Sequence, residues 1–177
     1  MKKILCLLLV LLMTLSFVAC ADDDGTPEGM QNVSTENALF NLYVPASWIP
    51  TTAGGVSGAR YSSSDASNVT VTTYLPESEM SAADYWTNIC LPNYRDGGVL
   101  QNFTVVEASC KDTTLGGKDA KQYVFTYTLD GVAYEVMQVI VAGGDMMMYT
   151  LTYTAVSTKY AEHLEDVERI RAEFRFR

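Results

Sequence analysis

The sequence predicts an α+β fold in which an antiparallel β-sheet meander packs between helices. Two glycine-containing turns carry this prediction, because Asp130-Gly131 and Gly143-Gly144 each lie between two runs rich in β-branched, aromatic and other apolar residues. A third observation comes from the C-terminal segment, where apolar residues recur every three to four positions. Strands joined by short turns pair antiparallel, and the amphipathic segment supplies a helix to cover them.

The elements before these turns follow from local composition. Residues 39–44 predict a first strand, and residues 50–58 predict a loop because they hold a proline and three glycines. Residues 59–63 predict a short strand. Residues 68–74 are rich in Val and Thr and predict a longer strand, which a proline follows closely.

A helix is expected to follow this strand. Ser81 can cap its first turn, with Asp84 at the third position as a weak capping box. Pro92 should end or kink the helix, since proline lacks a backbone N–H. Residues 103–109 predict the next strand, which a Gly116-Gly117 turn follows.

The register of the last three strands follows if both central turns contain two residues. Leu129 then pairs with Val132, and Ala142 pairs with Asp145. One sheet face becomes almost entirely apolar, and it consists of Tyr123, Phe125, Tyr127, Leu129, Tyr134, Val136, Gln138, Ile140, Met147, Tyr149, Leu151 and Tyr153. The opposite face is half polar, so we expect the sheet to be packed over one whole face and half of the other.

The C-terminal helix is predicted over residues 158–173. Its expected buried stripe recurs at helical spacing and consists of Tyr160, Leu164, Val167, Ile170 and Phe174. Acidic side chains fill the other side, and His163 is expected to be solvated among them.

The first 20 residues predict an export signal. Lys2 and Lys3 precede an apolar run that is too short to span a bilayer comfortably, and Ala19 precedes Cys20. This junction resembles the lipobox of bacterial lipoproteins, although Phe17 stands where Leu is usual. The resemblance implies that residues 1–19 are removed as a signal peptide and that Cys20 is acylated, for example with palmitate. A plain secretory signal with Cys20 as an ordinary thiol remains the alternative.

The rest of the chain is expected to form an acidic tether and one domain. Residues 20–37 hold three consecutive aspartates, glycines and a proline, and predict a flexible tether that follows the lipidated Cys20. Residues 38–177 predict a single domain. The whole chain carries a formal net charge of −9, so nucleic acid is excluded as a partner, as is an anionic headgroup surface bound through basic residues. The expected location is the extracytoplasmic face of the cell membrane, with a lipid anchor.

Two cysteines lie in the predicted domain. Cys90 and Cys110 form an even pair in an exported chain, which is compatible with a disulfide. Two buried free thiols are the alternative, because sequence does not show whether the two Cα atoms approach closely enough.

The order of elements resembles the PsbP-like family of extrinsic photosystem subunits and their bacterial relatives. The matching residues are those of the segment 40–45 with Trp48, the segment 149–155, Tyr160 and Phe174. The resemblance implies an α/β/α sandwich over about residues 39–176. The family's functions include assembly and stabilisation of membrane complexes. No metal-binding or ligand-binding residue can be matched position by position.

The sequence shows no catalytic or cofactor motif. His163 is the single histidine and has carboxylates but no second histidine beside it, so no metal site is expected. There is no Gly-x-Ser-x-Gly elbow and no phosphate-binding loop. We therefore expect a non-enzymatic, membrane-tethered lipoprotein without cofactors that binds or stabilises a protein partner. The alternative is a small-ligand-binding lipoprotein or an enzyme with a cryptic site.

Overall fold

An antiparallel sheet forms the centre of the protein. The computed structural model describes residues 25–51, 53–97, 100–144 and 146–177, and in them eight strands form a sheet of order β4-β5-β6-β11-β10-β9-β7, with β8 also paired to β9. Its strands are β4 (Ile49–Thr51), β5 (Ser57–Arg60), β6 (Asn68–Tyr74), β7 (Gln101–Val105), β8 (Lys111–Leu115), β9 (Lys118–Leu129), β10 (Val132–Ala142) and β11 (Met148–Val156). The predicted α+β class with an antiparallel meander is confirmed.

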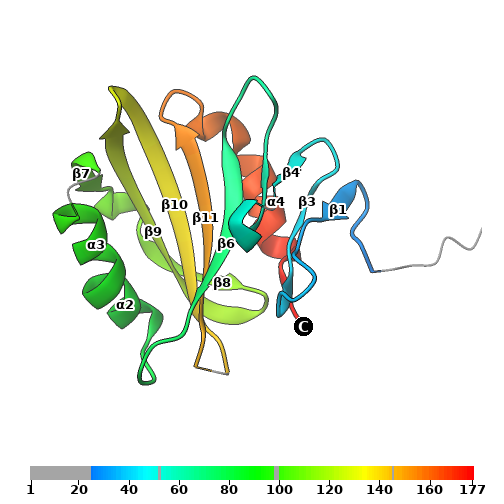
Figure 1. Ribbon diagram of the computed structural model, residues 1–177, viewed down its shortest axis with the longest axis horizontal. Coiled ribbons are helices and arrows are strands. Elements are labelled where there is room, and N and C mark those ends of the chain that lie inside the picture. Colours follow the sequence, from blue (N-terminus) through cyan, green and yellow to red (C-terminus); the bar gives the residue numbers. More distant parts are fainter. Residues whose placement is uncertain (1–24, 52, 98–99, 145) are drawn as a thin grey trace, which may run out of the picture.

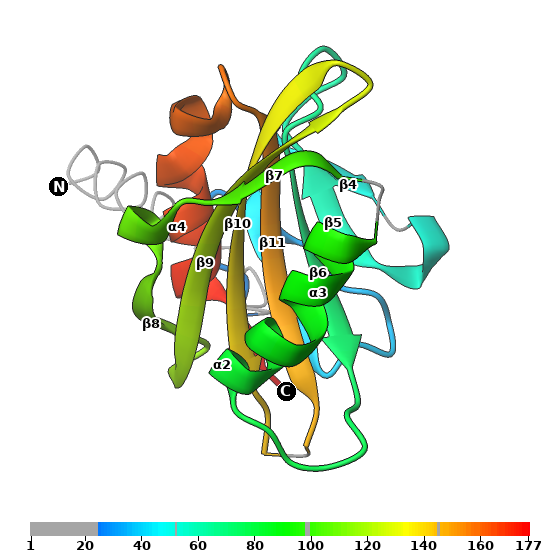
Figure 2. The same cartoon turned by 90° about the vertical axis from the view of Figure 1, so that its left-hand side faces the viewer.

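Helical layers cover both faces of this sheet (Figures 1 and 2). On one face lie α2 (Ala82–Tyr85), the π-helical segment η2 (Trp86–Cys90) and α3 (Leu91–Asp96). On the other lie the 3-10 segment η4 (Tyr160–His163) and α4 (Leu164–Glu173). Beside α4, β1 (Met30–Asn32) pairs with β3 (Tyr43–Pro45), and β2 (Phe40–Asn41) pairs with β12 (Arg175–Phe176). Two short 3-10 turns, η1 (Ala53–Gly55) and η3 (Glu107–Ser109), complete the elements.

Each helical layer closes its own hydrophobic core. The larger core packs α4 and the small strands against the sheet and includes Leu42, Trp48, Val167, Ile170 and Phe174. The smaller core lies under α2, η2 and α3 and consists of Trp86, Cys90, Phe125, Val136, Ile140 and Met148. The predicted stripe of the C-terminal helix is therefore confirmed as the contact between this helix and the sheet.

Two of the predicted turns are present as expected. Leu129 pairs with Val132 across the Asp130-Gly131 turn, and Leu115 pairs with Lys118 across Gly116-Gly117. Gly116 has a φ of +58°, and a Cβ there would lie 2.7 Å from the Phe176 ring, so conformation and space both demand glycine.

The predicted register of β11 is wrong. Ala142 pairs with Met148 rather than with Asp145, because the connection spans residues 143–147 and closes through a 2.7 Å hydrogen bond from Gly143 N–H to Met147 C=O. A shift of three positions is odd, so it turns every side chain of β11 to the other face. Leu151 consequently lies opposite Val139 and joins the core under α4, not the face predicted for it.

The helix after β6 begins as predicted and is then distorted near Pro92. Ser81 caps it, accepting a 3.0 Å hydrogen bond from Asp84 N–H and donating its hydroxyl to the Asp84 carboxylate at 2.6 Å. Pro92 lies in the first turn of α3 and offers no N–H, and the preceding turn is π-helical, with Leu91 N–H bonded to Trp86 C=O. The proline thus shifts the helix instead of ending it.

The predicted tether is too long at its C-terminal end. Met30 and Val33 are buried, and β1 pairs with β3. The side-chain amide of Gln31 also donates to the Trp48 carbonyl at 2.7 Å. A mixed polar composition hid this strand, so the folded part begins before residue 38. Residues 1–24, with the predicted signal and Cys20, lie outside the described part of the chain.

Residues 50–58 are predicted as a loop but contain part of β4 and the start of β5. Pro50 is tolerated there because β4 is an edge strand, where the missing N–H of proline removes no hydrogen bond between strands.

Among the described residues, none of the helices combines the length and the apolar character needed to cross a bilayer.

Candidate functional site

One sheet face is only partly covered by its helices and carries a shallow groove. The aromatic groove, as we call it, has a volume of about 210 Å³. It is lined by Tyr94, Leu100, Phe125, Tyr127, Val136, Gln138, Thr152 and Thr154. Tyr94 of α3 stacks on Phe125 at a centroid distance of 5.1 Å, so the helix forms one wall and the sheet forms the floor.

Gln138 is the polar centre of this groove. Its side chain is only 5 % exposed, and its amide nitrogen donates to the Tyr94 hydroxyl at 2.8 Å and to the Thr152 hydroxyl at 3.3 Å. Its amide oxygen is buried without a hydrogen-bond partner among the described residues. Burial raises the pKa of Tyr94, which keeps the phenol protonated and uncharged.

The turn that joins β9 and β10 lies at the end of the sheet away from α2 (Figure 2), and apolar side chains lead from the groove towards it. Tyr127 and Tyr134 stack across β9 and β10 at 5.3 Å. Beyond them, the paired residues Leu129 and Val132 are 38 % and 40 % exposed at the hairpin turn. We call Tyr127, Leu129, Val132 and Tyr134 the hairpin patch. An exposed apolar surface of this kind is typical of an interaction site.

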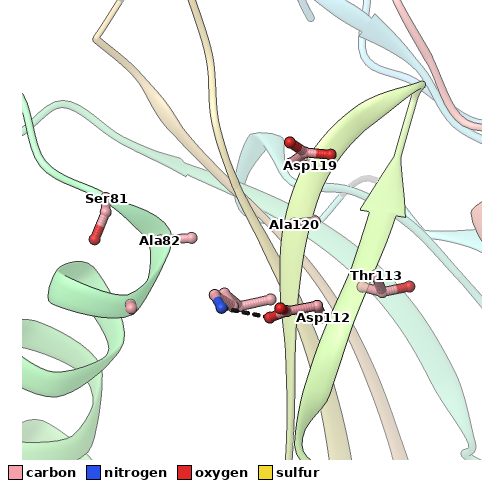
Figure 3. A pocket seen from close by; sticks show the side chains of 8 residues that line it. Ser81, Ala82, Asp112, Thr113, Asp119 and Ala120 are labelled. Carbon is pink, nitrogen blue, oxygen red and sulfur yellow. Dashed lines mark hydrogen bonds and ion pairs between the residues drawn. The ribbon is translucent and has the colours of Figure 1, made fainter.

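A second cleft, of about 480 Å³, lies between the start of α2 and the β8–β9 hairpin (Figure 3). Asp112 and Lys121, directly paired on β8 and β9, form an ion pair there, and Asp119 lies further along β9. Its lining contains neither His nor Cys. The lining holds two carboxylates and one ammonium group, of which Asp112 and Lys121 pair, and it offers no histidine base to activate a hydroxyl nucleophile.

His163 lies in a different environment from the one predicted for it. Its side chain is 6 % exposed, and its Nε2 lies 3.0 Å from a carboxylate oxygen of Asp65, in the loop between β5 and β6. The Tyr61 ring stacks over the imidazole at 3.9 Å. The expectation of a solvated histidine is therefore wrong. Residues 163, 167, 170 and 174 share one helical face, and this spacing was the signal that could have revealed its burial.

The Asp65 carboxyl is held in its charged form. Burial alone raises its pKa, but hydrogen bonds from Ser67 and His163 and the attraction of His163 outweigh that effect and lower the pKa to about 2. Sequence analysis did not single out Asp65, because its partner is 98 positions away in the chain.

The two cysteines of the domain are free thiols in the described structure, but only Cys90 is buried, whereas the predicted alternative to a disulfide was two buried thiols. Cys90 is buried in the smaller core, and Cys110 is half-buried with its Sγ 3.6 Å from the Val106 carbonyl oxygen. Burial raises the pKa of Cys90 to about 11, although a hydrogen bond with Tyr85 acts the other way. The Cys90 thiol therefore stays protonated and unreactive near neutral pH.

Comparison with known proteins identifies the fold. No family model matches the chain, and no curated protein matches it. Among solved structures, it is similar to cyanobacterial PsbP (CyanoP) from Synechocystis sp. PCC 6803, with a TM-score of 0.59 and 11% identity over 84% of this chain and 93% of the other.

It is also similar to LpqN, a protein involved in cell envelope biogenesis of Mycobacterium tuberculosis, with a TM-score of 0.55 and 15% identity over 82% of this chain and 89% of the other. A third similar structure is PA94 of Pseudomonas aeruginosa, a protein of unknown function and putative regulator, with a TM-score of 0.52 and 13% identity over 79% of this chain and 92% of the other. The chain thus has a PsbP-like fold, as the sequence resemblance implied. At such identities the likeness carries the fold and not the activity.

Proposed function

We propose that this protein is an extracytoplasmic module, tethered to the membrane by a lipid on Cys20, that acts by binding a protein partner. The observation that carries the proposal is the N-terminal sequence, in which a basic start and a short apolar run end at Ala19-Cys20. The PsbP-like fold supports it, since LpqN, one of the similar structures, is involved in cell envelope biogenesis. The residues between Cys20 and the start of β1 are few and include three aspartates, so they would form a short acidic linker between the lipid and the domain.

Replacement of Cys20 tests the anchor. Cys20→Ser in the full chain should abolish incorporation of labelled palmitate and move the protein from the membrane pellet to the soluble exported fraction. Cys6→Ser is the matched control, because it removes a cysteine within the apolar run and leaves the junction intact. The anchor is contradicted if the Cys20→Ser protein is still labelled and pellets as fully as the wild type.

The hairpin patch supports a protein partner. Its exposed members Leu129 and Val132 lie next to each other at the end of the sheet, and the two tyrosines behind them extend the apolar surface. A closed pocket with convergent polar groups would instead favour a small ligand, and the two clefts described above are open grooves. Because this chain is negatively charged, a partner whose contact surface is acidic would be repelled and is disfavoured.

Charge introduced into the patch tests this role. Leu129→Lys together with Val132→Lys should reduce recovery of co-purifying proteins from solubilised membranes of the native host, with little change in the melting temperature, because both positions are exposed. The matched control is Thr72→Lys with Thr73→Lys, two exposed positions on β6. Unchanged recovery with the patch variant speaks against the patch as the contact surface.

The aromatic groove supports one second candidate, a small ligand bound on the sheet. The observation that favours it is the buried amide oxygen of Gln138 beside Tyr94 and Thr152, which finds no hydrogen-bond partner within the described ranges. A ligand that carries an N–H or O–H group could satisfy that oxygen after a small movement of the side chain. Mass spectrometry of ligands released from the native protein, compared with Thr152→Trp, tests this candidate.

A further inference from the structure

Three potential metal ligands meet where the β5–β6 loop reaches η4, at a cleft of about 560 Å³. Asp65, Glu162 and His163 line this cleft, and one ligating atom from each lies within 4.8 Å of the other two. The loop and the C-terminal helical segment lie at the same end of the sheet in Figure 1. This grouping combines an imidazole with two carboxylates, which is a different donor set from a patch of surface acids.

The imidazole is fixed in place by its surroundings. Tyr61 stacks on one side of it at 3.9 Å, and Trp48 contacts it edge-on at 6.4 Å. The Trp48 indole N–H is in turn held by Asp166 at 3.0 Å. A ligand whose ring is held by packing and by a second layer of hydrogen bonds loses little freedom when it binds an ion.

The spacing of the donors suits a small divalent ion. The Nε2 of His163 and the carboxylate oxygen of Asp65 are 3.0 Å apart. Two ligands of a tetrahedral zinc ion, each about 2.1 Å from the metal, lie about 3.4 Å from each other. A movement of a few tenths of an ångström would give this pair the spacing of two zinc ligands, with the ion in place of the proton that they share. The Glu162 carboxylate, whose oxygen lies within 4.8 Å of both, must also turn towards the ion.

The charges at the cleft also permit an ion to bind. The Asp65 carboxylate accepts a hydrogen bond from the Ser67 N–H at 2.9 Å, which holds this anionic group at the cleft. Glu162 is half-exposed and pairs with Lys159 at 2.8 Å, and the Lys159 side chain is itself 48 % exposed. An exposed ion pair of this type contributes little to stability, so Lys159 can turn into solvent and release Glu162.

We infer that Asp65, Glu162 and His163 bind one divalent first-row transition ion, for which zinc is the probe. One imidazole and two carboxylates suit zinc or manganese better than calcium or magnesium, which prefer oxygen ligands alone. Water from the cleft completes the coordination. The bound ion ties the β5–β6 loop to the start of the C-terminal helix. This inference is independent of the proposed partner binding and of the lipid anchor.

Calorimetric titration of zinc into the metal-stripped full chain in detergent tests the site. The wild type should bind one ion per chain and melt at a higher temperature with zinc. Asp65→Asn and Glu162→Gln should each weaken binding about tenfold or more, because each removes a charged ligand. Lys159→Gln should strengthen binding several-fold, because it frees Glu162.

Two further comparisons keep the result decisive. Glu165→Gln removes an exposed acid of the adjoining helix α4 outside the cluster and should bind zinc like the wild type. All these variants retain Cys90 and Cys110, so binding that persists unchanged in Asp65→Asn and Glu162→Gln would come from the thiols or the surface. Such persistence, or the lack of a one-to-one complex in the wild type, overturns the inference and leaves His163 and Asp65 as a structural pair.

Discussion

His163 shows how a single residue can depend on a partner far away in the sequence. Its neighbours Glu162, Glu165 and Asp166 give the segment a polar appearance. The 3-10 turn of η4 precedes α4, and His163 lies at the junction on the same side as Val167 and Ile170. The cost of burying its polar ring is offset by the carboxylate of Asp65.

Replacing this histidine should destabilise the protein. His163→Ala removes buried packing and one partner of a buried pair, so we expect a loss of about 1–3 kcal/mol in the free energy of unfolding. Urea denaturation of metal-free protein measures it, with Glu165→Ala, an exposed change worth about 0.5 kcal/mol or less, as the control. Equal midpoints for the two variants would show that His163 is not buried as described.

We expect the contribution of the Asp65 carboxylate to the free energy of unfolding to depend on pH. Its folded pKa of about 2 lies below the ordinary value of 3.8, so the unfolded chain takes up its proton first. The contribution is therefore fully present above about pH 5 and is lost as the pH falls from about 4 towards 2. The difference in unfolding free energy between the wild type and Asp65→Asn, measured from pH 7 to pH 2.5, should shrink over that interval. A constant difference would contradict a lowered pKa.

At the scale of elements, β11 shows what decides which face a strand presents. A two-residue Gly143-Gly144 turn is a good local solution, yet the chain uses a five-residue connection and a register shifted by three. This register places Tyr149, Leu151 and Tyr153 in the core under α4, where β6 supplies Val69 and Val71 beside them. Burial of those large side chains outweighs the preference of the turn.

Core substitutions on β9 and β11 should differ from a neighbour that is only half-buried. Phe125 and Leu151 are 2% and 0% exposed and belong to opposite cores. Phe125→Ala and Leu151→Ala should each cost about 2–5 kcal/mol. Thr126→Ala should cost much less. Denaturant titration compares the unfolding free energies of the three variants. Similar losses for Phe125→Ala and Thr126→Ala would contradict the burial of Phe125 described here.

At the scale of the whole molecule, the N-terminal segment is part of the fold. β1 pairs antiparallel with β3 beside α4, and the Val33 N–H donates to the Leu42 carbonyl at 2.9 Å. Arg175 and Arg177 donate to backbone carbonyls of Gly25 and Ala38, so the two ends of the described chain lie against each other. The boundary between the predicted tether and the folded domain therefore lies before Met30.

Truncation distinguishes linker from fold. A chain that begins at residue 25 should keep the melting temperature of the full chain. A chain that begins at residue 38, the predicted start of the domain, should melt markedly lower, because the buried side chains of Met30 and Val33 and the pairing of β1 are lost. Scanning calorimetry makes the comparison. Identical melting temperatures would show that residues 30–37 belong to the tether and not to the fold.

Local sequence information by itself determined the fold class, the Asp130-Gly131 and Gly116-Gly117 turns, the Ser81 cap and the stripe of the C-terminal helix. These features rest on residues close together in the chain, where periodicity and turn chemistry act directly. The tertiary structure decided the register of β11, the burial of His163, the folding of residues 30–37 and the grouping of Asp65 with Glu162 and His163. Each of these depends on contacts between segments far apart in the sequence, and the burial gained there overrides the local preference.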